Sequence, residues 1–179
     1  DNIDIVINEL DALAHIDLKT KEIKAIGRTL NIVRIGTSGS VQADIPVDSF
    51  VISEKSIGCD GVLRFYANNE SVCDHPFEEA FIRHCRWTPS AARPYVVNAD
   101  PGLVDRLYDE EHTIKGVTLT AVGFYGPQGR VLRLPLAMPG INDRITAFRY
   151  EGYKVTNYEM ESAAISGLCN LLGHRAATI

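Results

Sequence analysis

The stretch VTNYEMESAAISGLCNLLGHRAATI, residues 155–179, decides the fold of this chain. It begins with a short strand predicted over 155–158, passes through residues 159–161 into a helix predicted over 162–172, and ends in an apolar run at 176–179. Gly173 is predicted to end the helix, because glycine readily adopts the left-handed conformation found after helical C-termini. A strand, a helix and a second strand in this order are typical of a layered α/β fold.

The same alternation continues through the rest of the chain. Apolar residues at helical spacing alternate with short apolar runs that have the pattern of buried strands. Asp100 is a suitable N-cap for a helix that opens at Pro101. The remaining helices are predicted over 3–13, 75–86 and 141–150, and the remaining strands over 30–35, 50–57, 95–97 and 117–124. We therefore predict the α/β class.

The two ends of the sequence bear on its domain organisation. Asp1 rather than a methionine opens the chain, and the final run at 176–179 reads as an unfinished strand. We therefore expect a single domain over residues 1–179 that is truncated at both ends.

Composition narrows the class of protein. The chain has 179 residues, of which 45% are hydrophobic, and this excludes a disordered protein. It contains no apolar run long enough to span a bilayer. Its net charge of −5 disfavours nucleic-acid binding, which requires a basic face. The four cysteines form no CxxC pair, so a zinc site is not expected. Such sparse cysteines are expected to be reduced thiols in a cytoplasm.

The first motif with chemical potential is IVRIGTSGS, residues 32–40. It places a glycine- and hydroxyl-rich turn directly after an apolar strand, where backbone N–H groups are exposed and an anion can approach closely. Arg34 adds a guanidinium whose planar fork matches phosphate oxygens. The pattern favours a phosphate site but is not a Walker loop, because no Gly-Lys-Ser/Thr follows. An ordinary strand-to-loop turn remains the alternative.

The second motif is Glu159-Met160-Glu161, between a predicted strand and a predicted helix. In extended backbone the two glutamates point to the same side, and their carboxylates could accept hydrogen bonds from a ribose 2′,3′-diol. The alternative is a charged helix start, because glutamates are favourable at the positive end of a helix dipole.

The third motif is FYGPQGR, residues 124–130, in which Phe124 is expected to end a strand and Gly and Pro to shape a turn. Gln128 offers a donor and an acceptor together, as needed to read an amide edge. Arg130 can stabilise an oxygen that becomes negative, and Phe124 can stack on a flat ring. A turn with a surface arginine is the alternative.

The order of these three motifs resembles the uridine phosphorylase branch of the nucleoside phosphorylase superfamily, over nearly the whole chain. The resemblance implies a three-layer αβα fold with a central mixed, partly barrel-like sheet. It implies reversible phosphorolysis of uridine, with deoxyuridine as a further expected substrate, to uracil and (deoxy)ribose 1-phosphate. The enzyme class would be a pentosyltransferase.

The resemblance also implies roles for the phosphate and ribose residues. Thr37 is expected to lie near the ribose as well as the phosphate. Glu161 would hold the ribose hydroxyls, with Met160 packing on the sugar. The expected phosphate-binding residues are Arg34, Thr37, Ser38 and Gly39.

On the base side, the resemblance assigns Gln128 and Arg130 to the uracil edge and Phe124 to the base ring. Glu159 is placed in the same base-binding set. The residues expected to be catalytic are Arg34, Arg130 and Glu161.

The chain departs from the family in several places. The family's Gly-Asp-Pro-x-Arg phosphate loop, its arginine that reaches a neighbouring subunit and its histidine for the ribose 5′-hydroxyl are not found in this sequence. By resemblance, no redox cofactor or metal is implied, and inorganic phosphate is the co-substrate. The expected partners are a nucleoside and phosphate, with no nucleic acid and no membrane. A homodimer or a hexamer made of three dimers is expected, with the first helix near the dimer interface.

Three other functions remain open from the sequence. A purine nucleoside phosphorylase would prefer inosine, and a nucleosidase would release base without phosphate. A non-catalytic nucleoside-binding module would bind uridine and release no uracil. The Gln128 and Arg130 pair favours the pyrimidine enzyme.

Overall fold

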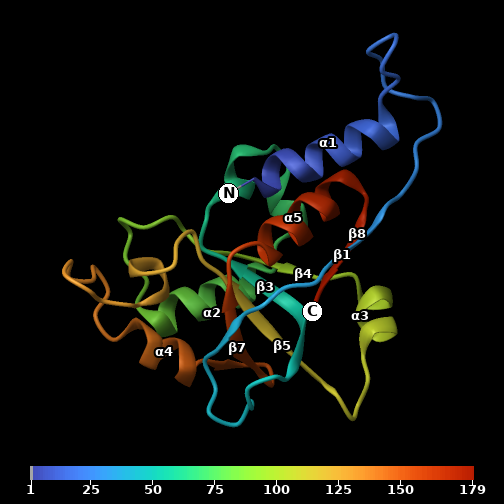
Figure 1. The fold of residues 1–179 in the computed structure, drawn as a ribbon. Helices are drawn as coiled ribbons and strands as arrows, with labels where there is room; N and C mark the ends of the chain where they lie inside the picture. The colour runs from blue at the N-terminus through green and yellow to red at the C-terminus, as the bar shows by residue number, and fades with distance from the viewer. Residues whose placement is uncertain (1) are drawn as a thin grey trace.

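A computed structural model describes residues 2–179, and it places a mixed β-sheet between two helical layers (Figure 1). The helices are α1 (Ile3–His15), α2 (His75–Cys85), α3 (Pro101–Leu107), α4 (Ile141–Ala147) and α5 (Ser162–Leu172), with short 3-10 turns η1 (Val62–Phe65), η2 (Asn69–Val72) and η3 (Gly126–Gln128). The strands are β1 (Asn31–Arg34), β2 (Gly39–Ser40), β3 (Phe50–Gly58), β4 (Tyr95–Asn98), β5 (Thr113–Thr120), β6 (Arg149–Tyr150), β7 (Tyr153–Glu159) and β8 (Arg175–Thr178).

The strands form one large sheet and one small sheet. The large sheet has the order β2-β7-β5-β3-β4, with β6 paired to β7. Strands β3, β5 and β7 run parallel, whereas β2, β4 and β6 run antiparallel to their neighbours. Strands β1 and β8 form a separate parallel pair, with Arg34 opposite Thr178. The carboxyl ends of β5 and β7 therefore lie side by side, at the edge where α/β folds commonly bind ligands.

Each face of the sheet has its own hydrophobic core. On one face α1 and α5 pack together, and Ile7 and Leu168 are buried there with Tyr95. On the other face α2 and α4 bury Phe77 and Phe148 against the sheet. Figure 1 shows these two helical layers on opposite sides of β3, β5 and β7. The layered α/β arrangement expected from the sequence is confirmed.

Two expected helix boundaries follow the predicted cap chemistry. The Asp100 side chain accepts a hydrogen bond from the Leu103 backbone N–H, and Pro101 opens α3. Gly173 ends α5 with a φ of 75°, the left-handed conformation that suits glycine. These ends were predictable because the interactions that make them are local in sequence.

Two other expectations were wrong at their ends. The strand expected over 117–124 is β5, which starts at Thr113 because it pairs with β3, and which stops at Thr120. Phe124 therefore lies in the loop after the strand. The helix expected over 141–150 stops at Ala147, because the chain turns into the β6–β7 hairpin.

Within residues 2–179, none of the helices combines the length and the apolar character that crossing a membrane would require. The four cysteines are free thiols, as expected, and Cys59, Cys85 and Cys169 are buried. Burial raises the pKa of Cys85 and of Cys169 to about 12, so both stay protonated at neutral pH.

Candidate active site

A cavity of about 440 Å³ lies where β1, β5 and β7 end. It is bordered by the turn after β1, by the loop after β5 and by the junction of β7 with α5. Every residue that the three sequence motifs assigned to the site lines this cavity. The lining residues are Arg34, Thr37, Ser38, Gly39, Phe124, Gln128, Arg130, Tyr158, Glu159, Met160 and Glu161. Three segments far apart in the sequence therefore share one space.

Arg34, the last residue of β1, lies between the two glutamates of the second motif. Its Nη2 atom is 2.5 Å from Glu161 Oε2, and its Nε atom is 3.6 Å from Glu159 Oε2. The Arg34 side chain is only 17% exposed. A guanidinium has five N–H donors, so Arg34 can hold these carboxylates and still present donors to an anion in the cavity.

Glu159 and Glu161 differ in their surroundings. The Glu159 side chain is 1% exposed, whereas that of Glu161 is 31% exposed. Glu159 Oε2 accepts hydrogen bonds from the backbone N–H groups of Glu161 and Ser162, and its Oε1 accepts one from the Thr120 hydroxyl. Glu159 therefore acts at the start of α5, as the charged-helix-start alternative proposed. Glu161 is the carboxylate with capacity for a ligand.

The turn of the third motif, residues 124–130, is organised by Arg130, and we call it the base-side turn. Its Nη1 atom donates to the Phe124 carbonyl at 2.7 Å and to Gln128 Oε1 at 2.5 Å. Its guanidinium also lies over the Phe124 ring, 4.0 Å from the centroid. The aromatic ring, the amide and the guanidinium of the third motif are thus held together before any ligand binds. Arg130 is nevertheless exposed, so the alternative of a turn with a surface arginine also fits this geometry.

The sequence motifs did not identify three residues that support the site. Asn142 on α4 contacts the base-side turn, Tyr158 on β7 contacts Asn142, and Asn157 on β7 contacts Ser38. Tyr158 stays protonated, because burial raises its pKa well above the usual tyrosine value. No local signal marks these residues, since each acts through a partner distant in sequence.

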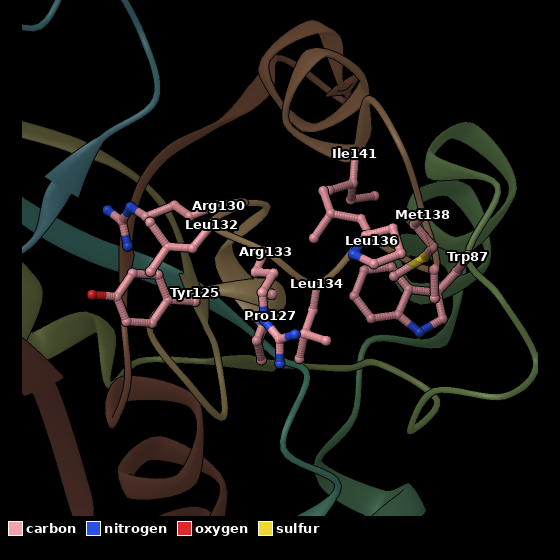
Figure 2. A pocket seen from close by; sticks show the side chains of 13 residues that line it. Trp87, Tyr125, Pro127, Arg130, Leu132, Arg133, Leu134, Leu136, Met138 and Ile141 are labelled. Carbon is pink, nitrogen blue, oxygen red and sulfur yellow. The ribbon is translucent and has the colours of Figure 1, made fainter.

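A second pocket of about 560 Å³ adjoins the first, and Figure 2 shows its lining. Tyr125 and Arg130 lie at one end, and Trp87 and Met138 lie at the other (Figure 2). Most of the lining is apolar and comes from the loop that contains residues 132–138. Such a surface offers few partners for phosphate and hydroxyl oxygens, so the first cavity is the better candidate for the reacting groups.

One cluster of possible metal ligands lies away from this cavity. Asp11 and His15 on α1 meet His174, with His15 Nδ1 2.9 Å and His174 Nε2 3.1 Å from Asp11 Oδ1. The Nδ1 atom of His174 accepts a hydrogen bond from the Leu30 backbone N–H, so the neutral ring carries its proton on Nε2. That nitrogen then has no lone pair for a metal. The cluster is better suited to tie α1 to the chain before β8.

Comparison with known families gives one match over almost the whole chain. The family model for the phosphorylase superfamily matches residues 4–179. Two curated relatives are named uridine phosphorylase. The one from Thermococcus kodakarensis is 26% identical over 165 residues, covering 89% of this chain and 50% of the relative. The one from Haemophilus influenzae is 25% identical over 154 residues, covering 82% of this chain and 50% of the relative.

A third relative has a different name. A DeoD-type purine nucleoside phosphorylase from Hahella chejuensis is 29% identical over 126 residues, covering 64% of this chain and 52% of the relative. This chain therefore spans about half the length of the curated relatives it matches.

Among solved structures, a nucleoside phosphorylase from Trypanosoma brucei, described as showing uridine phosphorylase activity, superposes with a TM-score of 0.76. It is 24% identical, and the match covers 99% of this chain and 65% of that structure. The expected nucleoside phosphorylase fold, with its mixed sheet between helices, is confirmed by this similarity.

Proposed function

The chain belongs to the phosphorylase superfamily, and from that premise we propose that its full-length protein is a uridine phosphorylase. The proposed reaction converts uridine and phosphate into uracil and ribose 1-phosphate, reversibly. Inorganic phosphate is the second substrate, and no step requires a redox cofactor or a metal. Deoxyuridine is a further proposed substrate.

One observation carries this proposal. A guanidinium, a carboxylate and an amide–guanidinium pair line the same cavity: Arg34, Glu161, and Gln128 with Arg130. These groups suit a phosphate, a ribose diol and a uracil edge respectively. The turn at residues 36–39, the phosphate-side turn, also lies close to the base-side turn, because a Cβ atom on Gly39 would be 4.0 Å from Arg130 Nη2. A nucleoside and a phosphate could therefore occupy neighbouring positions.

The nucleophile in this mechanism is phosphate. Arg34 and the N–H groups of the 36–39 turn would orient it toward C1′ of the ribose. Cleavage of the glycosidic bond develops positive charge on the sugar ring, and the bound phosphate offsets that charge before it forms the new C1′–O bond. Glu161 and Thr37 would hold the ribose, with Met160 against the sugar. Positioning of this kind supplies much of the rate enhancement without a covalent enzyme intermediate.

The leaving group is the uracil anion, which takes the electron pair of the broken bond. Arg130 and Gln128 would stabilise the charge that develops on the uracil edge, with Phe124 against the ring. Because Arg130 is already hydrogen-bonded to Gln128, the pair needs little reorganisation when that charge develops. Glu159, whose carboxylate accepts bonds from the start of α5 and lies 3.6 Å from Arg34 Nε, would act indirectly, on the phosphate and ribose side rather than on the base.

A purine nucleoside phosphorylase is the second candidate. The DeoD-type relative, 29% identical over 126 residues, favours it. The Gln128 and Arg130 pair favours uracil, because the resemblance to the uridine phosphorylase branch assigns this pair to the uracil edge.

The decisive experiment measures base release by the full-length protein, from uridine and from inosine, with and without phosphate. We expect uracil release from uridine that requires phosphate. Release of uracil without phosphate would indicate a nucleosidase, and a preference for inosine would indicate the purine enzyme. Binding of uridine with no release of uracil would indicate a non-catalytic module.

We further propose a homodimer, or a hexamer of three dimers, in the cytoplasm. Helix α1 exposes Ile5 and Leu13 at 63% and 61%, which favours coverage by a second copy of the chain. The free thiols favour a reducing compartment. Sedimentation of the full-length protein would measure the assembly, and a monomer at micromolar concentration would contradict it.

A further inference from the structure

We propose that two asparagines, Asn157 and Asn142, are positioning residues that set the phosphate half and the base half of the cavity independently. This inference rests on the proposed uridine phosphorolysis and deepens it. Neither asparagine belongs to the sequence motifs, and each acts through one hydrogen bond to a loop that borders the cavity.

Asn157 holds the phosphate-side turn. Its Nδ2 atom donates to Ser38 Oγ at 2.9 Å. Its Oδ1 atom accepts from the Thr118 hydroxyl at 2.9 Å, and Thr118 Oγ1 lies 2.5 Å from Ser53 Oγ. Since the Thr118 proton is engaged with Asn157, the Ser53 hydroxyl donates to Thr118. A directed chain of buried hydrogen bonds thus runs from β3 through β5 and β7 to the turn.

The direction of this chain determines what Ser38 can do. The Ser38 oxygen already accepts from Asn157, so its hydroxyl proton is left for an acceptor in the cavity. Ser38 is exposed and lines that cavity. Asn157 therefore prepares Ser38 as a donor to a phosphate oxygen, while the buried chain behind it prevents the turn from shifting.

Asn142 holds the base-side turn. Its Nδ2 atom donates to the Gln128 backbone carbonyl at 3.0 Å, and its Oδ1 atom accepts from the Tyr158 hydroxyl at 3.2 Å. Gly129 leaves space for this amide, because a Cβ atom there would be 2.6 Å from the amide nitrogen and oxygen of Asn142, and its φ of 68° suits glycine. Asn142 is thus fitted against the backbone between Gln128 and Arg130.

The two supports reach the cavity from opposite faces of one strand. Asn157 and Tyr158 are consecutive residues of β7, and consecutive side chains of a strand point to opposite faces. Tyr158 packs in the core beneath α2 and α4, whereas Asn157 joins the hydroxyls of Thr118 and Ser53. The supports share no hydrogen-bond partner, so their effects should be separable.

The test is a crossed measurement of KM in the full-length protein. We expect Asn157→Ala to raise the KM for phosphate about fivefold, with the KM for uridine within about twofold of the wild type. We expect Asn142→Ala to give the reverse pattern. A residue needed only for folding would change both constants, or kcat alone, together with the melting temperature.

Milder variants protect the test against misfolding. Ser38→Ala removes the exposed hydroxyl that accepts the hydrogen bond from Asn157. Tyr158→Phe removes the hydroxyl that donates to Asn142 Oδ1. Each should reproduce the pattern of its asparagine. Ser56→Ala is the matched control, because Ser56 is a buried hydroxyl of β3 that finds no partner among the described residues. It should leave both KM values unchanged.

The outcomes separate this inference from the proposed function. If the wild type releases uracil with phosphate but the variants on both sides raise both KM values equally, the inference is overturned and the proposed function stands. If the wild type shows no phosphate-dependent release, the proposed function fails, and the positioning roles fail with it.

Discussion

The two sides of the cavity are built differently. On the phosphate and ribose side, the functional groups stand at the ends of strands, where Arg34 is 17% exposed and Glu159 is 1% exposed at the side chain. On the base side, they stand on a loop after β5, where Phe124 is 55% exposed and Tyr125 is 53% exposed. The first side is supported by buried bonds from the sheet. The second is supported by Arg130 within its own turn and by one amide from α4.

Because of this difference, we expect the two sides of the cavity to tolerate substitutions to different degrees. A group held by the sheet cannot move without breaking buried hydrogen bonds, so Arg34 and Glu159 should tolerate little change. A loop can change its side chains at little structural cost, so the selection of the base can vary on an unchanged scaffold. Four substitutions test this contrast.

The largest effect is expected at the base-side guanidinium. Arg130→Ala should lower turnover of uridine on the order of a hundredfold or more, because one donor at a developing negative charge contributes that much. The fold should remain stable, because the loop is exposed. Uracil release measures the effect, and Arg133→Ala, an arginine of the neighbouring pocket, is the matched control. Unchanged turnover in Arg130→Ala would remove Arg130 from its proposed role.

On the phosphate and ribose side, the next effect concerns stability. Glu159→Gln should reduce the free energy of unfolding by about 2 kcal/mol, because a glutamine has one acceptor oxygen, and its NH2 group would face either the Thr120 hydroxyl or the backbone N–H groups of Glu161 and Ser162. Denaturant unfolding measures this change. Glu79→Gln is the control, since the pair of Glu79 with Arg93 is exposed and contributes little. Equal free energies of unfolding for the two variants would contradict the proposal that the phosphate and ribose side tolerates substitution less than the base side.

The ribose carboxylate should affect substrate choice. Glu161→Gln should weaken kcat/KM for uridine about tenfold, because a charged acceptor contributes more to a hydroxyl hydrogen bond than a neutral one. The loss for 2′-deoxyuridine should be smaller, because one hydroxyl is missing. Steady-state kinetics on both nucleosides measures the ratio, and an equal loss on both would exclude the diol contact.

The smallest effect is expected at the exposed ring. Phe124→Leu should raise the KM for uridine about threefold, because it removes a ring face while keeping an apolar side chain. The KM for phosphate is the internal control and should not change. A larger rise in the phosphate KM than in the uridine KM would show that the two sides are not separate.

Much of the fold could be predicted because its determinants are local. The helix at 162–172, its end at Gly173 and the cap at Asp100 depend on residues within a few positions of each other. The start of β5 at Thr113 depends on pairing with Phe50, which no local pattern records. The end of α4 at Ala147 depends likewise on the hairpin that follows it.

For the candidate site, too, the sequence predicted some residues and missed others. The motifs predicted the groups that line the cavity, because the residue types in a short segment already identify its hydroxyl, guanidinium and carboxylate groups. They did not separate Glu159, whose carboxylate serves α5, from Glu161, whose carboxylate reaches Arg34. They also did not reveal Asn142 or Asn157, because an asparagine has no distinctive pattern until its partner is known.

By itself, the sequence determined the alternation of strands and helices and the chemical groups available for a phosphate, a sugar and a base. Only the tertiary structure decided that these groups line one space and which side chains hold them there. The physical reason is range. Backbone preferences and side-chain chemistry act over a few residues, whereas strand pairing and buried hydrogen bonds join segments that meet only after the chain has folded.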